Sequence, residues 1–214
     1  MDINVSIVLS QNMTLVYDSL DLQAIDSSEL KRLMGIQTKP MVIDAPEMIV
    51  AVYPPEPTVI QIGDSRIRIT LSQNSKEIGG VPLWEIAVKC SRLVSESKSK
   101  LVAYGFNYDI GAELVSGNAY KVTKELFVSN PKMIESALGG YILSFVPRFI
   151  FQRDQTRYDL VLEPLDEQRI KVHMNAHFEF EGIALPSQDQ LQVSFYEEYK
   201  YLGSILPRLF EGGE

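Results

Sequence analysis

Hydrophobic residues recur along this chain with the two periods that separate strands from helices. In residues 2–10 an apolar side chain occupies every second position, which is typical of a strand with one buried face. Short β-rich runs on either side of Gly63 predict a hairpin, because a three-residue loop containing glycine suits that turn. The run 141–151 is expected to bend near Pro147. The further runs that show the strand pattern are residues 48–53, 58–62, 66–71, 101–110, 141–151, 158–162 and 169–180.

Other segments carry apolar residues at the spacing of a helix face. Residues 82–97 follow the i, i+3, i+4, i+7 pattern and predict an amphipathic helix. A capping box that begins at Ser187 predicts a long C-terminal helix over 188–210. Gly203 and Pro207 predict that this helix kinks or ends early. Shorter helices are expected after Asp26, with an end at Gly35, and over 131–138, whereas residues 118–128 fit neither pattern.

These elements predict an α+β fold. We expect a mostly antiparallel sheet of six to eight strands, with the helices of 82–97 and 188–210 packed on one face. The order βββα occurs twice, in residues 47–97 and 141–210. The two copies share no residue-level identity, so duplication and chance local order both remain open. Because no linker-like stretch interrupts the chain, residues 1–214 form a single domain or two closely packed lobes, about 1–100 and 101–214.

Composition narrows the classes of partner. The net charge is -8, from 20 basic and 28 acidic residues, and no basic patch stands out, so nucleic acid is not expected as a partner. The single cysteine, Cys90, allows no intrachain disulfide and no multi-cysteine zinc site. Apolar runs are far shorter than the ~20 residues of a membrane span, and the first residues lack the signal-peptide pattern. A cytoplasmic protein is expected, with no membrane partner.

One strand carries both histidines of the chain. His173, Asn175, His177 and Glu179 fall on the same face of the run 169–180, a pattern that suggests acid–base chemistry. Residues two apart on a strand are roughly 7 Å apart and residues four apart roughly 13 Å, so the two imidazoles cannot share a metal ion. No metal site is therefore predicted. His177 with Glu179 remains a weak catalytic pair, and a solvated strand face with ion pairs to its neighbours is the simpler interpretation.

A second candidate lies on the run 101–110, where Gly105, Asn107 and Asp109 share one face. Small residues leave space above a sheet, and polar side chains at the end of that space can orient a ligand. This pattern predicts a small-molecule pocket between the sheet and a helix. Tight packing of a helix over Ala103 and Gly105 explains the same residues.

The chain lacks the motifs of the common enzyme classes. It contains no phosphate-binding glycine loop and no nucleophile elbow, and Cys90 lies on an apolar helix face. These absences favour a protein that is not an enzyme and needs no cofactor. The leading hypothesis is a protein–protein interaction or self-associating module, acting through a sheet edge or through the C-terminal helix with its cluster of tyrosines. The alternatives are a small-ligand-binding protein and, third, a hydrolase or isomerase that uses a His/Glu pair.

Overall fold

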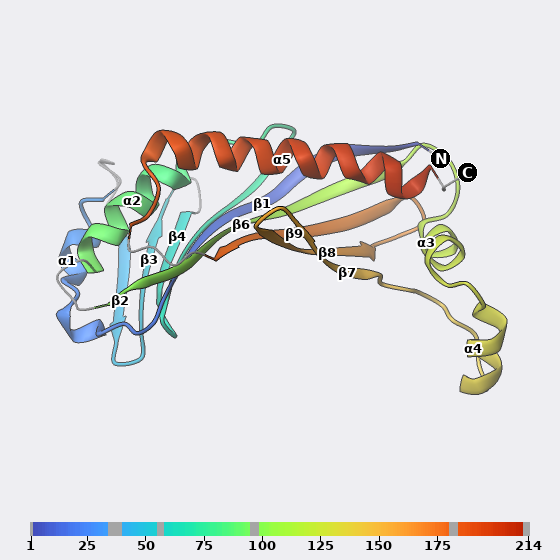
Figure 1. Ribbon diagram of the computed structural model, residues 1–214, viewed down its shortest axis with the longest axis horizontal. Coiled ribbons are helices and arrows are strands. Elements are labelled where there is room, and N and C mark those ends of the chain that lie inside the picture. Colours follow the sequence, from blue (N-terminus) through green and yellow to red (C-terminus); the bar gives the residue numbers. More distant parts are fainter. Residues whose placement is uncertain (1, 34–39, 55–57, 95–98, 180–183, 212–214) are drawn as a thin grey trace.

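The computed structural model of the chain describes residues 2–33, 40–54, 58–94, 99–179 and 184–211. Their strands form one nine-stranded antiparallel sheet in the order β2-β3-β4-β5-β1-β6-β9-β8-β7 (Figure 1). The strands are β1 (Ile3–Tyr17), β2 (Met41–Ala45), β3 (Met48–Tyr53), β4 (Thr58–Gly63), β5 (Arg66–Ser75), β6 (Leu101–Leu114), β7 (Arg148–Arg153), β8 (Thr156–Pro164) and β9 (Arg169–Glu179). The helices are η1 (Leu22–Ala24), α1 (Ser27–Leu30), α2 (Leu83–Val94), α3 (Ala119–Phe127), α4 (Pro131–Leu138) and α5 (Gln188–Phe210). The predicted α+β fold with a long C-terminal helix is confirmed.

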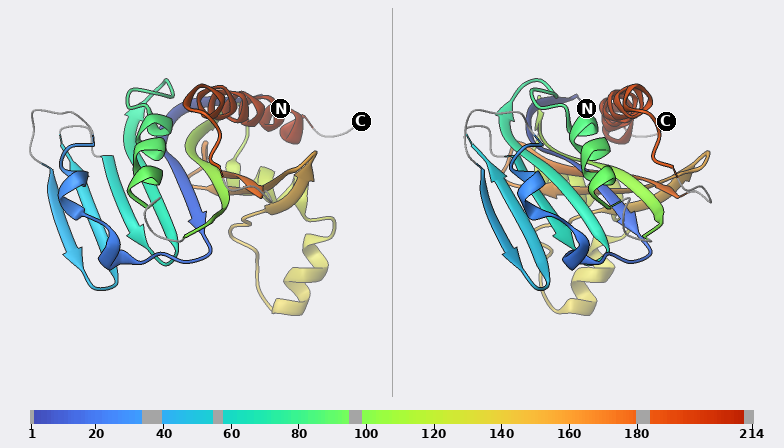
Figure 2. Two further views of the ribbon diagram at one scale, coloured as in Figure 1. Left: turned by 60° about the vertical axis from the view of Figure 1, so that its left-hand side comes forward. Right: turned by 90° about the vertical axis from the view of Figure 1, so that its left-hand side faces the viewer.

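Helices α2 and α5 cover one face of this sheet (Figure 2). Helix α2 packs on β1 and β5, and α5 packs on β1 and β6. The bulky side chains of β6 point toward the helices. Phe106 and Tyr108 are fully buried, and the ring of Phe195 on α5 lies 5.4 and 5.2 Å from theirs. The helices therefore cover the bulky face of β6 and not the small face, over which the sequence pattern placed a helix.

The tyrosines of α5 also point into this core. Tyr196 packs against Trp84 of α2, with ring centroids 5.6 Å apart. Tyr199 packs against Tyr108 at 5.7 Å, and Tyr201 contacts the sheet in the same way. These rings therefore fill much of the space between the helix and the sheet.

The repeated βββα order accounts for every strand of the sheet except the edge strand β2 and the central pair β1 and β6. The units β3-β4-β5-α2 and β7-β8-β9-α5 form its two wings, and β1 pairs with β6 at the centre. Asn12 faces Asn107 across this central pair; Thr70 of β5 faces Asn12, and Asn175 of β9 faces Asn107. Helices α2 and α5 each begin 13 residues after Thr70 and Asn175 respectively. The halves are thus related by a pseudo-twofold axis that passes between Asn12 and Asn107, which favours duplication over chance.

Some segments differ from their predictions. Strand β1 is longer than expected, and register shifts after Val5 and Val8 change which residues face the helices, so Val5 is 39% exposed while Val8 is fully buried. Residues 141–147 do not form the predicted start of a strand, because Pro147 cannot donate to a ladder and β7 begins only after it. Helix α5 continues through Pro207 rather than ending early.

One strand was not predicted, and the predicted ends of two helices lie outside the described residues. The sequence pattern did not identify β2, a short edge strand whose side chains at Met41 and Ile43 are exposed. The expected helix end at Gly35 lies outside the described residues, as do the last residues of the segment 82–97. No helix in the described part of the chain combines the length and apolar character that crossing a bilayer requires.

Candidate functional site

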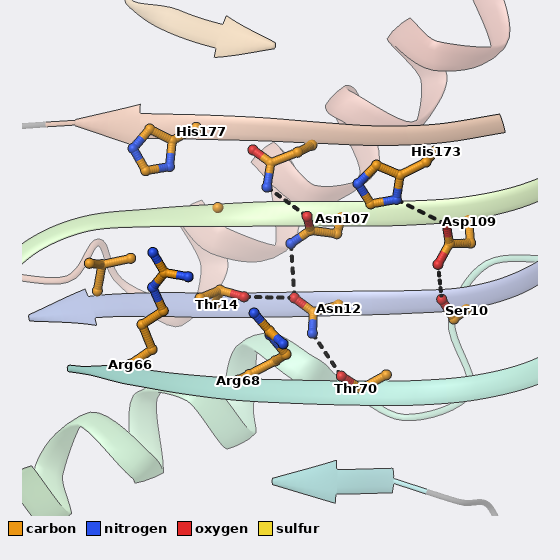
Figure 3. Close-up of a pocket in the computed structure, with 13 residues that line it drawn as sticks. Ser10, Asn12, Thr14, Arg66, Arg68, Thr70, Asn107, Asp109, His173 and His177 are labelled. Atoms are coloured by element: carbon orange, nitrogen blue, oxygen red, sulfur yellow. Dashed lines mark hydrogen bonds and ion pairs between the residues drawn. The ribbon is translucent and has the colours of Figure 1, made fainter. Parts of the chain in front are cut away.

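The face of the sheet opposite α2 and α5 carries a polar trough. It crosses the four central strands, β5, β1, β6 and β9, and encloses about 480 Å³ (Figure 3). This volume falls within the range of small-molecule sites. The residues that line it are Ser10, Asn12, Thr14, Val16, Arg66, Arg68, Thr70, Gly105, Asn107, Asp109, His173, Asn175 and His177.

A row of amide side chains forms the floor of the trough. The Nδ2 of Asn175 donates to the Oδ1 of Asn107 at 2.6 Å, and the Nδ2 of Asn107 donates to the Oδ1 of Asn12 at 2.9 Å. The Nδ2 of Asn12 then donates to the hydroxyl of Thr70 at 2.7 Å. Thr14 also donates to the Oδ1 of Asn12, at 2.8 Å. Because each amide is held by a neighbouring strand, the row has a fixed orientation on the pseudo-twofold axis.

Asp109, two residues along β6 from Asn107, has two hydrogen-bond partners and one further ion-pair partner. Ser10 Oγ donates to its Oδ2 at 2.7 Å, and Nδ1 of His173 lies 2.9 Å from its Oδ1. The ammonium of Lys171 lies 3.7 Å from Oδ1. Burial favours the neutral acid, but the hydrogen bonds from His173 and Ser10 and the nearby positive charges outweigh it, so the pKa of Asp109 lies below its ordinary value.

This arrangement does not resemble a catalytic triad. In a Ser-His-Asp triad the imidazole lies between the nucleophile and the carboxylate, where it can accept the proton of the serine. Here the carboxylate of Asp109 lies between Ser10 and His173 and accepts from the serine directly. The geometry stabilises a half-buried charge and does not place the imidazole of His173 to accept the proton of Ser10.

The trough unites the two sets of residues that the sequence singled out separately. Gly105, Asn107 and Asp109 pair across strands with His177, Asn175 and His173 respectively. His177 also lies 3.2 Å from the carboxylate of Glu179 at the end of the strand. All of them face away from α2 and α5. The trough is therefore an open sheet face, and neither the expected pocket between sheet and helix nor a helix over Gly105 is present at these described residues.

Sequence reasoning missed the half of the trough that comes from β1 and β5. The alternation of Ser10, Asn12, Thr14 and Val16 marks a polar strand face, but the shift after Val8 hides its continuity with the first strand pattern. Arg66 and Arg68 lie on the second strand of the predicted hairpin, where they alternate with buried isoleucines. Their position beside β1 depends on sheet order, which local pattern does not reveal.

Chemistry that needs a metal or a reactive thiol finds no support in the described residues. They contain no group of three or more His, Cys, Asp or Glu side chains placed to hold a metal ion. Cys90 is fully buried, and this burial raises the pKa of its thiol to about 12, which leaves it protonated. The lining of the trough contains no Phe, Tyr or Trp, so it offers no ring for stacking a base or a sugar.

A second surface feature, which we call the arm, consists of residues 131–147. It comprises α4 and the extended chain that leads to β7, and α4 projects away from the sheet (Figure 1). None of the α4 side chains is buried. Tyr141 is 87% exposed and Leu143 is 86% exposed. The arm therefore leaves most of its apolar side chains exposed, although Glu135 pairs with Lys124 of α3 and the carbonyl oxygen of Pro147 accepts a hydrogen bond from Leu162.

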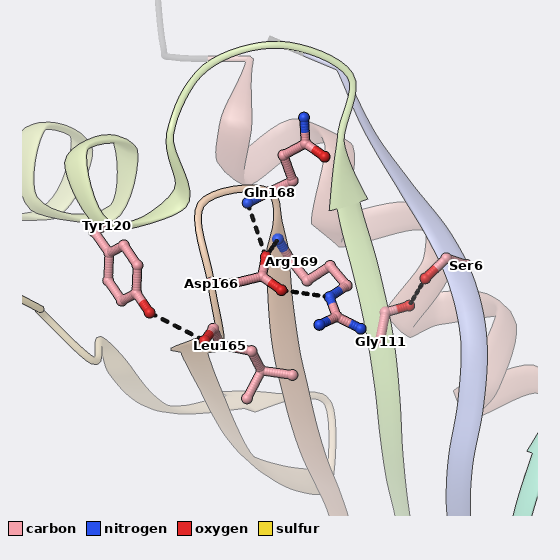
Figure 4. A network of polar contacts seen from close by, with 7 residues as sticks. All are labelled: Ser6, Gly111, Tyr120, Leu165, Asp166, Gln168 and Arg169. Carbon is pink, nitrogen blue, oxygen red and sulfur yellow. Dashed lines mark hydrogen bonds and ion pairs between the residues drawn. The ribbon is translucent and has the colours of Figure 1, made fainter.

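The base of the arm is fixed by the turn between β8 and β9 (Figure 4). Asp166 accepts hydrogen bonds from the backbone of Gln168 and Arg169 and from the Nε of Arg169, at 2.6 to 2.9 Å. The hydroxyl of Tyr120 on α3 donates to the carbonyl oxygen of Leu165 at 3.0 Å. Helix α3 is thereby fastened to the sheet, and the arm that follows it leaves from a defined position.

An apolar groove of about 640 Å³ lies beside the arm, between the edge strand β7 and the end of α5. Stacking of Phe151 on Tyr158 at 4.9 Å and contact of Phe149 with Phe127 at 5.3 Å shape one wall. Arginines form its rim. The residues that line this groove are Arg148, Phe149, Ile150, Phe151, Leu160, Tyr201, Ile205, Arg208 and Leu209.

The sequence of the chain was compared with protein-family models and with curated proteins. A scan against protein-family models found no match, and a search of curated proteins found none either.

Proposed function

We propose that this protein is a non-catalytic, self-associating module in which the arm of one copy occupies the groove of a second. The observation that carries the proposal is the coexistence, on one chain, of an apolar arm with Tyr141 and Leu143 almost fully exposed and an open apolar groove. Large exposed apolar surfaces are characteristic of interaction sites.

A second copy of the chain is the occupant that this arrangement favours. Residues 136–147 contain no charged side chain, so they match the apolar lining of the groove. The arm runs directly into β7, one wall of that groove. Exchange of arms about a twofold axis therefore buries both features on both copies at once, as an isologous dimer requires. Met133, Leu138, Tyr141 and Leu143, the most exposed apolar side chains of the arm, would lie in this contact.

Direct pairing of two β7 strands is the less favourable way to associate. Arg148 and Arg153 stand at the two ends of the strand. Antiparallel pairing about the strand centre would set the arginine of one copy opposite the arginine of the other, and like charges in that position destabilise a sheet. Charged residues at an edge protect it from such pairing. The groove and the arm are therefore the surfaces that we expect to meet.

Analytical ultracentrifugation of paired variants tests this proposal. Ile150 in the groove is 58% exposed and Ile43 on the opposite edge strand is 52% exposed, so Ile150→Lys and Ile43→Lys are matched changes. Leu143→Asp in the arm has a matched control in Val193→Asp on the outer side of α5, where Val193 is 56% exposed.

We expect the wild-type chain to sediment as a dimer at micromolar concentration. Leu143→Asp and Ile150→Lys should weaken the dimer by about tenfold or more, because each buries an unpaired charge in an apolar interface, whereas the two controls should leave it intact. A wild-type chain that stays monomeric at high concentration, or a dimer that only the control variants dissociate, would overturn the proposal.

We further propose that the protein acts in the cytoplasm. The single cysteine is buried and unpaired, so the described fold needs no oxidising compartment. Cell fractionation with an antibody against the chain tests this placement, and recovery only from an extracytoplasmic fraction would contradict it.

A further inference from the structure

The pseudo-twofold axis gives the trough two equivalent ends, and each end carries a pair of basic side chains. The axis relates Asn12 to Asn107 and Thr70 to Asn175. Arg68 stands two residues before Thr70, and His173 stands two residues before Asn175, so the axis relates these two basic residues as well. By the same register it relates Arg66 to Lys171. Each wing of the sheet thus carries two basic residues at equivalent positions, and of these four, Arg66, Arg68 and His173 line the trough.

The two ends differ in how these charges are compensated. At the β9 end, Lys171 lies opposite Glu163 of β8, and both Lys171 and His173 contact the carboxylate of Asp109. Asp109 is two residues beyond Asn107 on β6. The carboxylates on the neighbouring strands therefore neutralise the basic pair of this end.

At the β5 end both carboxylates are replaced by neutral residues. Thr14, two residues beyond Asn12 on β1, stands where Asp109 stands at the other end, and it lies opposite Arg68. Gly63 lies opposite Arg66 on β4, as Glu163 lies opposite Lys171. Among the described residues, no carboxylate forms an ion pair with Arg66 or Arg68. Figure 3 shows both guanidinium groups leaning from β5 toward β1, on either side of Thr14.

We propose that this end of the trough binds the carboxylate of a small organic acid, held between Arg66 and Arg68 above Thr14. The carboxylate of Asp109 is its internal counterpart at the other end. Guanidinium groups are well suited to this task because their parallel N–H donors match the two oxygens of a carboxylate. The body of the ligand lies along the amide row, where Asn107 and Asn175 offer polar contacts.

The rest of the trough limits the ligand to a small acid. Polyanions such as nucleic acids are disfavoured by the net charge of -8. The absence of Phe, Tyr and Trp from the lining disfavours ligands that bind by ring stacking. A volume of about 480 Å³ accommodates a small polar molecule.

Isothermal titration calorimetry with glutarate as the probe tests this site, with inorganic phosphate as the second titrant. We expect one glutarate per wild-type chain. Arg66→Gln combined with Arg68→Gln should weaken binding by about tenfold or more, because it removes the charge-assisted hydrogen bonds. Both arginines are exposed, so this double variant should fold normally. Thr14→Asp should weaken binding in the same way, because it places a carboxylate where the ligand binds.

Asp109→Asn tests the proposed equivalence of the two ends of the trough most directly. Removal of the internal carboxylate leaves Lys171 and His173 without their contact to Asp109, so the number of glutarate molecules per chain should rise from one toward two. Val193→Asp adds the same charge as Thr14→Asp on the helix side and should leave binding unchanged. Absence of glutarate binding at millimolar concentration, or binding that the double arginine variant leaves intact, overturns the site. Tighter binding of phosphate than of glutarate overturns the proposed ligand class.

Discussion

The contact between Tyr108 and Phe195 fastens α5 to the centre of the sheet, and its removal should cost measurable stability. The hydroxyl of Tyr108 donates to the carbonyl oxygen of Phe195 at 2.6 Å, and both side chains are fully buried. Tyr108→Phe removes this bond without removing the ring. A buried hydrogen bond contributes about 0.5–1.5 kcal/mol, and the small void left by the oxygen adds to the loss, so we expect the free energy of unfolding to fall by about 1–2 kcal/mol.

Urea denaturation followed by circular dichroism measures this change. With a slope of about 2–3 kcal/mol per molar urea, the midpoint should fall by roughly 0.5 M. Tyr120→Phe is the matched control, because Tyr120 donates a 3.0 Å hydrogen bond to the carbonyl oxygen of Leu165 at an exposed position. The control should change stability by less than about 0.5 kcal/mol. Equal effects of the two variants would refute the claim that the buried bond anchors α5.

Three further predictions concern charges and glycines. The pKa of Asp109 is lowered in the folded chain, so its ionised carboxylate stabilises the fold above the ordinary aspartate pKa, and this stabilisation is lost as the pH falls. Asp109→Asn should therefore lower the free energy of unfolding by about 1 kcal/mol at pH 7 and by less in acid, as measured by urea denaturation. Burial raises the pKa of Glu198, so the wild-type chain loses stability as the pH rises above the ordinary glutamate pKa, and Glu198→Gln should melt at a higher temperature at pH 7. Gly203→Ala should raise the unfolding free energy by about 1 kcal/mol, because a Cβ there meets open space on a helix. Gly111→Ala should lower it by about 1–3 kcal/mol, because its Cβ would lie 2.7 Å from Ile7; the opposite order of melting temperatures would contradict this pair.

Local pattern predicted the elements that pack one face against the core. The alternation of the 101–110 run correctly predicts a strand with two different faces, although it did not reveal which face the helices cover. The Ser187 capping box is present at the start of α5, where Ser187 and Gln190 exchange hydrogen bonds. These features depend on contacts between residues close in sequence, so the sequence alone reveals them.

The trough could not be predicted in the same way, because it depends on strand order. His173 and Asp109 are 64 residues apart in the chain, and they meet only because β9 pairs with β6. Arg68 joins them from the other wing through β1. Bulges also defeat simple alternation, as the burial of Val8 in place of Val5 shows. Within the arm, the helix over 131–138 was predicted, but residues 141–147 were predicted as a strand because their apolar side chains resemble a buried β run; in the structure, most of these side chains are exposed.

Chemical cross-linking tests the central claim most directly, because it asks whether the arm of one copy lies in the groove of another. Leu143→Cys chains are mixed with Leu209→Cys chains and treated with a short bismaleimide. The native Cys90 is fully buried and stays unreactive. We expect a covalent dimer of the two variants, and only background product when Val193→Cys replaces Leu209→Cys. Absence of the mixed dimer, or equal yield with the Val193→Cys partner, would contradict the exchange of arms.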